Sequence, residues 1–302
     1  MIFTSNASAW ARIIAIAQCL FTMNCYAAEL YRYQDTGGKW HYTDKKPEKV
    51  KVESVTYKTT EKTRLEPKFF KQMNQQQSQL MVENPFHAPI ELSIRSSQID
   101  VSKQHRIIPA KGIVKLLSTV DEIQPYTYSW MLGDPNITPG AQIYDLPVST
   151  ITCHKISQAF HGKFSHHHAS SEFAVDIVMP VGIPIIAARE GIVVSTKDDY
   201  HMGGVNKYFL DKANHIRVLH SDGTFANYFH ILLGTAAVKV GDQVLKGTVL
   251  AKSGSSGYSS GPHLHFVIQQ NAGMRMNSIL FNFSDNKGSA FTPIAGKTIC
   301  NF

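Results

Sequence analysis

The sequence predicts a mainly β protein. Apolar and polar residues alternate over short segments such as Ile90-Glu-Leu-Ser-Ile94, and turns rich in glycine and proline separate these segments. From residue 151 onward the same pattern repeats along the chain with almost no helical periodicity. We therefore expect antiparallel sheets of short strands in both halves of the chain.

Length and composition bound the class of protein. The chain has 302 residues, of which 43% are hydrophobic and 18% charged, which suits two or three globular domains. The formal net charge is +7, and such a basic balance favours contact with anionic polymers such as nucleic acid, phospholipid or cell wall. The sequence has no run rich in lysine and arginine, so it does not support a dedicated nucleic-acid patch.

The first 28 residues are interpreted as a signal peptide. Arg12 precedes a short apolar run from Ile13 to Phe21, and small residues follow up to Ala27 and Ala28, where cleavage is expected. An uncleaved N-terminal anchor is the alternative, although the run is short for a membrane span. We expect an exported protein with no integral membrane segment after cleavage.

Two cysteines remain after this cleavage, Cys153 and Cys300. Two cysteines in an exported protein suggest one disulfide, here one that ties the C-terminal tail to the start of the C-terminal domain. Zinc binding by either is less favoured, because neither has a cysteine or histidine partner at zinc-finger spacing.

Residues 29–58 are predicted to form a small aromatic β module. Strand patterns at Leu30-Tyr-Arg-Tyr33 and Lys39-Trp-His-Tyr42 flank a glycine turn, and residues 51–57 suggest a further strand. The segment resembles a small module of unknown function at the front of bacterial envelope proteins. Its aromatic residues offer a sugar-stacking surface or, as we favour, the core of a tiny domain: Tyr31, Tyr33, Trp40 and Tyr42.

The next two segments carry no cluster of chemically reactive side chains. Residues 59–83 are polar and glutamine-rich, which indicates a linker or an exposed helix. Residues 84–146 return to strand patterns with glycine and proline turns, and we expect a small antiparallel β-sandwich there. The remaining residues, 147–302, are expected to form one domain.

The most specific feature of this last segment is Gly261-Pro-His-Leu-His-Phe266. Residues two apart on a strand share a face, so His263 and His265 project together while Leu264 faces a core. Two adjacent imidazoles suit a metal ligand beside a proton-transferring group, whereas a chance pair of surface histidines is the alternative. The glycine-rich loop before them favours the functional interpretation.

Two further strands offer polar groups. Asp176 lies in the apolar run Phe173-Ala-Val-Asp-Ile-Val-Met, and an unpaired carboxylate is costly to bury there. A metal would satisfy it, and a salt bridge or a turn cap would be the alternative. His230, in Tyr228-Phe-His, shares a face with Tyr228; alone it would be a solvated histidine, but beside His263 it could polarise a carbonyl or hold a water.

At this point the chain resembles the lysostaphin-like zinc metallopeptidases over residues 155–275. Five motifs in the family's order carry the resemblance: Asp176 to Val194, Asn214 to Thr224, Tyr228-Phe-His230, Val240 to Gly247, and Gly254 to Phe266. It implies an antiparallel β-sheet peptidase domain, one zinc ion per chain, and peptidoglycan as the partner, with hydrolysis in its stem peptides or cross-links.

The resemblance also implies individual roles. Asp176 and His265 match zinc ligands of the family, and His263 and His230 match its two catalytic histidines. This set agrees with zinc chemistry, because two histidines and a carboxylate leave an open position for water, which zinc activates.

The sequence departs from the family pattern at the first histidine ligand. The family places that histidine four residues before the aspartate, where this chain has Glu172. Histidines lie further back, in Phe164-Ser-His-His-His168. We favour His166 as the ligand, followed by His167, then His168 and Glu172.

Three further expectations complete the interpretation. An inactive relative that activates other wall hydrolases is the alternative function, but it predicts a lost aspartate or His-x-His motif. A lipoyl- or biotinyl-type carrier centred on Lys246 would leave His263 and His265 without a role. The expected location is the periplasm or cell envelope of a Gram-negative bacterium, with residues 29–146 positioning the enzyme on the wall or covering its groove.

Overall fold

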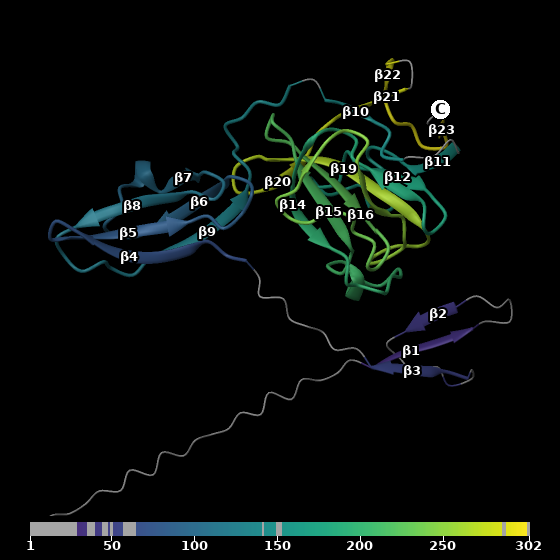
Figure 1. The fold of residues 1–302 in the computed structure, drawn as a ribbon, viewed down its shortest axis with the longest axis horizontal. Helices are drawn as coiled ribbons and strands as arrows, with labels where there is room; N and C mark the ends of the chain where they lie inside the picture. The colour runs from purple at the N-terminus through teal and green to yellow at the C-terminus, as the bar shows by residue number, and fades with distance from the viewer. Residues whose placement is uncertain are drawn as a thin grey trace, which may run out of the picture. The chain divides into compact units, whose positions relative to one another are not determined.

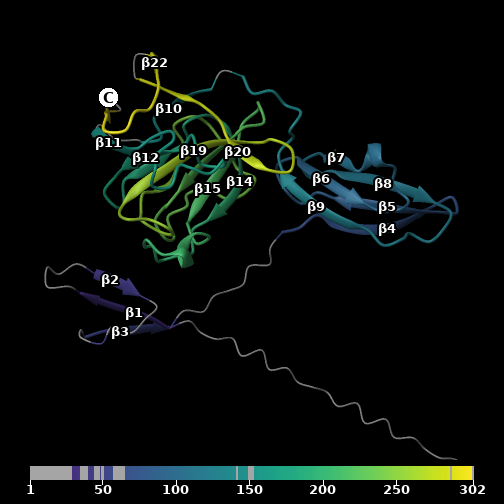
Figure 2. The same ribbon diagram turned by 180° about the vertical axis from the view of Figure 1, so that it is seen from behind.

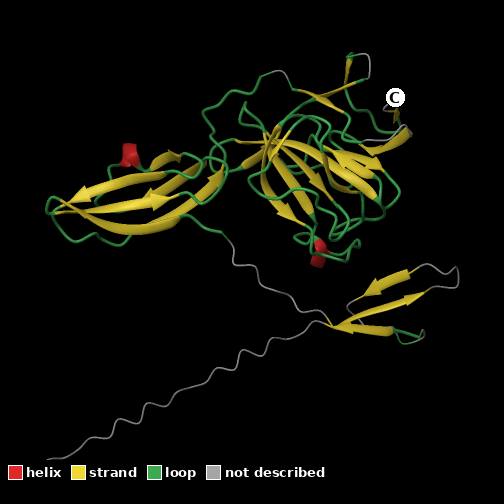
Figure 3. Ribbon diagram, viewed as in Figure 1, coloured by secondary structure: helices red, strands yellow, loops and turns green. Residues whose placement is uncertain are grey.

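A computed structural model describes residues 29–34, 40–43, 48, 51–56, 65–140, 142–148, 153–285 and 288–300. The predicted signal peptide, residues 1–28, lies outside them. The chain divides into two compact units, Met1–Thr63 and Arg64–Phe302. Among the described residues, no helix has the length and apolar character needed to cross a membrane. Strands dominate the fold, as predicted, and the described helices are two short 3₁₀ turns, η1 (Val101–Lys103) and η2 (Lys207–Phe209) (Figure 3).

The first unit contains a small antiparallel sheet. Its described strands have the order β2-β1-β3 and comprise β1 (Glu29–Gln34), β2 (Trp40–Thr43) and β3 (Glu53–Thr56). The hairpin register pairs Tyr33 with His41, and β3 pairs with the other edge of β1. The predicted hairpin and its additional strand are therefore both present.

The second unit begins with two small sheets that pack into a β-sandwich (Figure 1). Over residues 65–140 the strand orders are β4-β5-β8 and β7-β6-β9. A single buried apolar cluster joins them, including Leu80, Val82, Leu92 and Ile108. The strands are β4 (Lys68–Asn74), β5 (Gln77–Glu83), β6 (Ile90–Arg95), β7 (His105–Ile108), β8 (Ile113–Thr119) and β9 (Thr127–Leu132).

The polar linker predicted for residues 59–83 is wrong over its second half. Residues 68–83 form the hairpin β4–β5, and β5 is the central strand of its sheet. Most of β4 is exposed, which explains its polar composition, whereas Leu80 and Val82 on β5 are buried. A strand with one face in water carries many polar residues. When its glutamines are counted without regard to their alternation with apolar residues, its composition resembles that of a linker.

The C-terminal domain is built on one large antiparallel sheet (Figure 2). Nine strands of the described residues form it, in the order β17-β14-β15-β16-β19-β12-β11-β23, with β20 paired to β19. They are β11 (Cys153–Gln158), β12 (Val175–Val178), β14 (Gly191–Lys197), β15 (His215–Leu219), β16 (Phe225–Phe229), β17 (Gln243–Val244), β19 (His263–Asn271), β20 (Met276–Ser278) and β23 (Thr298–Cys300).

One face of this sheet covers the main core and the other carries polar side chains. Ile177, Tyr228, Leu264 and Phe266 belong to the buried cluster on the first face. The short pairs β13 (Pro184–Ile186) with β18 (Val249–Lys252), β10 (Ile143–Asp145) with β21 (Asn282–Ser284), and β22 (Ala290–Phe291) with β21 complete the domain. Because Tyr144 is part of this core, the domain extends a few residues before the predicted start at 147.

A disulfide closes the edge of the large sheet. Cys153 on β11 and Cys300 on β23 face each other in the antiparallel register and are bonded. The bond spans 147 residues of sequence, which is nearly the whole domain. It holds β23 against β11, the strand that leads directly into the loop of His166.

Buried polar contacts attach the sandwich to the large sheet. The carboxylate of Glu91 on β6, which is 6% exposed, accepts hydrogen bonds from Asn271 Nδ2 at 2.9 Å and from Met274 N at 2.6 Å. Beside them, Ala88 packs with Val194 and Phe225 in a small buried cluster. The sandwich and the sheet therefore share a desolvated interface.

Acid should destabilise this fold through His220. This residue is 2% exposed, and burial, then the nearby charge of Arg189, lowers its pKa from 6.5 to about 4. Because the unfolded chain holds the proton more tightly, stability is complete above pH 6.5 and is lost as the pH falls towards 4. We expect this group alone to lower the free energy of unfolding by about 2 kcal/mol between pH 7.5 and pH 5.

Urea unfolding of the wild type and His220→Gln at both pH values measures this contribution, with exposed His167→Gln as the matched control. The His220 variant should show the smaller loss of stability on acidification. An equal loss in all three proteins would refute the assignment.

Candidate metal centre

A groove of about 620 Å³ opens on the polar face of the large sheet. Its lining includes Asp176, His230, His263 and His265, together with the loop Tyr258 to Pro262. The sandwich residues that the structure describes contribute nothing to this lining, so the idea that they cover the groove finds no support in it.

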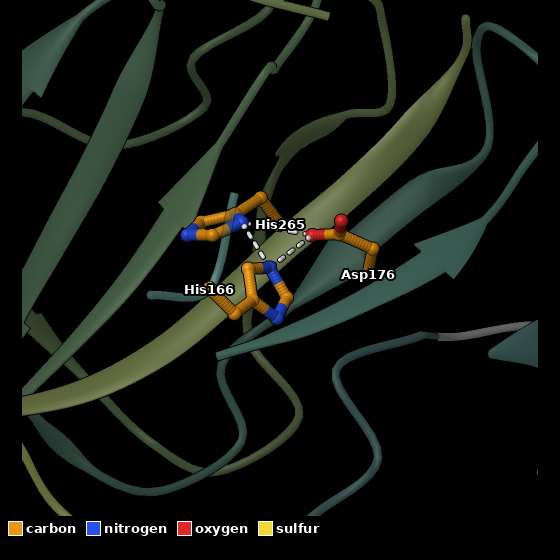
Figure 4. Close-up of side chains that lie close together, drawn as sticks. All are labelled: His166, Asp176 and His265. Atoms are coloured by element: carbon orange, nitrogen blue, oxygen red, sulfur yellow. Dashed lines mark hydrogen bonds and ion pairs between the residues drawn. The ribbon is translucent and has the colours of Figure 1, made fainter. Parts of the chain in front are cut away.

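The side chains of His166, Asp176 and His265 converge (Figure 4). Asp176 and His265 line the groove, whereas His166 is fully buried. His265 Nδ1 lies 2.8 Å from Asp176 Oδ1, and His166 Nε2 lies 3.2 Å from the same oxygen. The two ring nitrogens are 3.3 Å apart. Asp176 and His265 are directly opposite each other in the β12–β19 register, whereas His166 comes from the loop between β11 and β12.

These separations fit a tetrahedral metal ion. Zinc holds its nitrogen and oxygen ligands at about 2.0–2.1 Å, which puts neighbouring ligand atoms about 3.3 Å apart. The nitrogen–nitrogen and one nitrogen–oxygen separation match that value, and the third is about 0.5 Å shorter. Two imidazoles and one carboxylate are also a donor set that zinc prefers, so the residues fit this ion.

Surrounding groups orient two members of the triad, His166 and Asp176. His166 is fully buried, and its Nδ1–H donates to the carbonyl oxygen of Ala159 at 2.8 Å, which leaves Nε2 directed at Asp176. Gln158 Nε2 donates to Asp176 Oδ2 at 2.9 Å, so only Oδ1 faces the histidines. Burial raises the pKa of the Asp176 carboxyl, but hydrogen bonds from His166 and His265 outweigh it and hold that pKa well below its usual range.

His230 and His263 form a second pair beside the triad. Their ring centroids are 4.6 Å apart, and His263 Nε2 lies 3.8 Å from Asp176 Oδ1. Each donates its Nδ1–H to a loop carbonyl: His230 to Ser256 at 2.6 Å and His263 to Gly261 at 2.8 Å. Burial lowers the pKa of both, that of His230 to about 3, so both are neutral near pH 7 and carry a free Nε2 lone pair.

His230 occupies an unusual backbone conformation. Its φ is 65°, in the left-handed region that a residue with a Cβ adopts rarely. It immediately follows β16, so the turn directs its side chain toward His263 rather than continuing the strand alternation. Strain at such a position is typical of functional sites.

The other candidates for the first ligand lie elsewhere. His167 and His168 are exposed and stack on each other with centroids 4.2 Å apart. Glu172 forms an ion pair with His161 at 3.1 Å and is not part of the triad. The structure therefore brings His166, and not these three, to Asp176 and His265.

Sequence reasoning missed two features of this site. Gln158, which holds both Asp176 and the turn that precedes His166, is one of many glutamines and carries no spacing signal. Phe164 and Tyr258 stack across one side of the groove, with centroids 5.9 Å apart and planes at 24°. Only the proximity of Phe164 to the histidine run pointed to a role for this segment.

We expect zinc affinity to depend on His166 and not on its neighbour His167. His166→Ala removes a ligand and should lower zinc affinity by at least about 100-fold, whereas His167→Ala makes the same chemical change one residue away and should bind normally. Zinc content after dialysis against a buffered zinc series measures both. Equal affinity of the two variants would contradict the placement of His166.

Comparisons with known proteins match two segments of the chain. Residues 170–278 match the model of "Peptidase family M23" and residues 17–68 match a "Domain of unknown function (DUF4124)". The first segment contains Asp176, His230, His263 and His265, and it begins four residues after His166. The family pattern thus covers the groove except for β11 and the loop that delivers the buried histidine.

Three of the curated proteins that are similar to part of this chain are peptidases by name. The glycyl-glycine endopeptidase ALE-1 of Staphylococcus capitis is 33% identical over 105 residues, which is 35% of this chain and 26% of the relative. Lysostaphin of Staphylococcus simulans is 35% identical over 94 residues, 31% of this chain and 17% of the relative. The peptidoglycan DD-endopeptidase ShyA of Vibrio cholerae is 31% identical over 93 residues, 31% of this chain and 19% of the relative.

The chain therefore spans about a quarter or less of the length of these relatives. The family match over residues 170–278 includes most of the large sheet, and it contains Asp176, His230, His263 and His265, which line the groove. Residues 170–278 therefore belong to the M23, or lysostaphin-like, peptidase family, and residues 17–68 match a DUF4124 domain.

Proposed function

We propose that this chain is a zinc-dependent endopeptidase that hydrolyses peptide bonds in the stem peptides or cross-links of peptidoglycan. The observation that carries the proposal is the grouping of the buried His166 with Asp176 and His265, two residues that line an open groove together with His230 and His263. His166, Asp176 and His265 would hold the metal. When bound, zinc supplies a Lewis acid that polarises a carbonyl and makes a water molecule more acidic.

The two remaining histidines are suited to proton transfer. Both are neutral near pH 7, and their Nδ1–H groups are engaged by loop carbonyls, so Nε2 can accept a proton from the attacking water. The histidine that has accepted it then carries Nε2–H and can pass the proton to the leaving amine. Stabilising the charge that develops on the scissile carbonyl oxygen requires an Nε2–H on the other histidine, which it carries only in its protonated form or its other tautomer.

Three observations support peptidoglycan as the substrate. ShyA is named as a peptidoglycan DD-endopeptidase and ALE-1 as a glycyl-glycine endopeptidase, and both are similar to about a third of this chain. The net charge of +7 favours association with an anionic wall polymer. The predicted signal peptide and the Cys153–Cys300 disulfide agree with an exported protein of the cell envelope.

Digestion of purified sacculi is the direct test. The mature chain should release muropeptides, a chelator should stop the release, and added zinc should restore it. Analysis of the released fragments identifies the bond that is cut. A protein that binds sacculi and zinc but releases nothing would instead support the inactive activator.

His263→Ala should separate chemistry from metal binding. Because His263 is not a member of the triad, we expect the variant to retain zinc while its kcat falls by about 10²–10⁴-fold, the usual cost of losing a general base. Zinc content and initial rates on a soluble cross-linked peptide measure the two effects, with His167→Ala as control. Loss of zinc from His263→Ala, or an unchanged kcat, would overturn this role.

A further inference from the structure

Arg217 lies on the same face of the large sheet as the metal centre. In the register, His215, Phe229 and His265 form one row across β15, β16 and β19, and Arg217 and Asn227 begin the next row. Strand geometry puts Arg217 about 10 Å sideways and about 7 Å along the sheet from His265. That distance is about the length of three to four extended peptide residues.

The guanidinium of Arg217 has no acidic partner among the described residues. Its Nε–H donates to Asn227 Oδ1 and an Nη2–H donates to Gln269 Oε1 at 3.4 Å. Two other half-buried cations of this domain, Arg189 and Lys197, each have an aspartate partner at 2.6 Å. Burial lowers the pKa of Arg217 to about 10, so the side chain stays charged at neutral pH without such a partner.

A pocket of about 650 Å³ opens at this charge. Its lining combines Arg217 of the large sheet with residues Tyr128 to Leu132 of the sandwich strand β9. Trp130 is held in place there, because its indole N–H donates to Glu66 Oε2 at 2.6 Å and its ring stacks on Phe86. The pocket therefore combines a partly desolvated cation with a fixed aromatic wall.

We propose that Arg217 and β9 form a subsite that binds a carboxylate group of the peptide substrate, several residues away from the bond that is cut. This inference rests on the proposed endopeptidase function. A planar carboxylate matches the fork of a guanidinium and would supply the negative charge that the fold leaves out. Glu66, which also lines the pocket, would repel a doubly charged phosphate more strongly than a singly charged carboxylate.

A purely structural Arg217 is the competing explanation. Its guanidinium lies 5.7 Å from the ring centroid of Phe225, so the side chain also packs within the sheet face. Loss of packing would weaken turnover of every substrate equally, whereas a carboxylate subsite predicts a loss that depends on the substrate. The two explanations therefore differ in specificity and not in stability.

The experiment uses two soluble cross-linked peptides that differ at one group. One carries a free carboxylate beyond the scissile bond and the other carries the corresponding amide. The full mature chain should cleave the carboxylate peptide with a kcat/KM at least about tenfold higher, mainly through KM, because a charge-assisted hydrogen bond distinguishes the two. In Arg217→Met this ratio should fall to about one, and in Arg217→Lys it should be intermediate.

Arg95→Met is the matched control, because Arg95 is exposed on the sandwich and its loss changes the net charge equally. It should keep the wild-type ratio. A second readout avoids turnover altogether: quenching of Trp130 fluorescence by the carboxylate peptide in the metal-free protein should require Arg217, whereas the amide peptide and inorganic phosphate should quench weakly.

The outcomes separate this inference from the proposed function. If the wild type cleaves both peptides at the same rate, or if Arg217→Met lowers both rates by the same factor, the subsite is refuted while the endopeptidase stands. Phosphate that quenches as strongly as the peptide also refutes a carboxylate subsite. If neither peptide is cleaved with zinc present, the proposed function fails instead, and the fluorescence titration still decides the subsite.

Discussion

The metal centre depends on one register, the antiparallel pairing of β12 with β19 that puts Asp176 opposite His265. Residues opposite each other in such a pair have Cβ atoms about 4.5–5.5 Å apart, so a carboxylate and an imidazole meet without help from any loop. A slip of either strand by one residue would turn its own polar side chain, Asp176 or His265, into the apolar core. Leu264 and Ile177, which are paired next in the register and fully buried, make that slip costly.

The third ligand poses a different problem, because it comes from a loop. Gln158 positions this loop because it contacts both the loop and the carboxylate. Its Nε2 donates to Asp176 and to Ser165 Oγ, and its Oε1 accepts from Phe164 N. The β11–β12 register shifts between Ile156 and Gln158, and such an irregularity redirects a side chain. One amide thus fixes the carboxylate of one strand to the turn that leads to His166.

The sequence predicted those parts of the site that follow strand alternation, and failed where tertiary contacts decide. His263 and His265 could be placed from period-two alternation, and Asp176 from the cost of burying a carboxylate in an apolar run. His230 was also found from its strand, but the face that it was predicted to share with Tyr228 is wrong, because Tyr228 lies in the core and the left-handed turn at His230 breaks the alternation. Gln158 could not be found, because its role arises from a register shift that no local pattern encodes. The β4–β5 hairpin was missed for a related reason, since its exposed glutamines concealed the buried Leu80 and Val82.

The junction of sandwich and sheet shows how the fold distributes charge. Glu91 and Arg217 both lose hydration there, and an ion pair between them would have neutralised both. Instead, the Glu91 carboxylate accepts hydrogen bonds from Asn271 and Met274, and His105 Nδ1 lies 3.7 Å from it. Among the described residues, the Arg217 guanidinium donates only to the side-chain amide oxygens of Asn227 and Gln269. The anion therefore receives N–H donors within the described fold, whereas the guanidinium has oxygen acceptors but no carboxylate partner there. A carboxylate that arrives with the substrate would supply that partner on the face that carries the candidate metal centre.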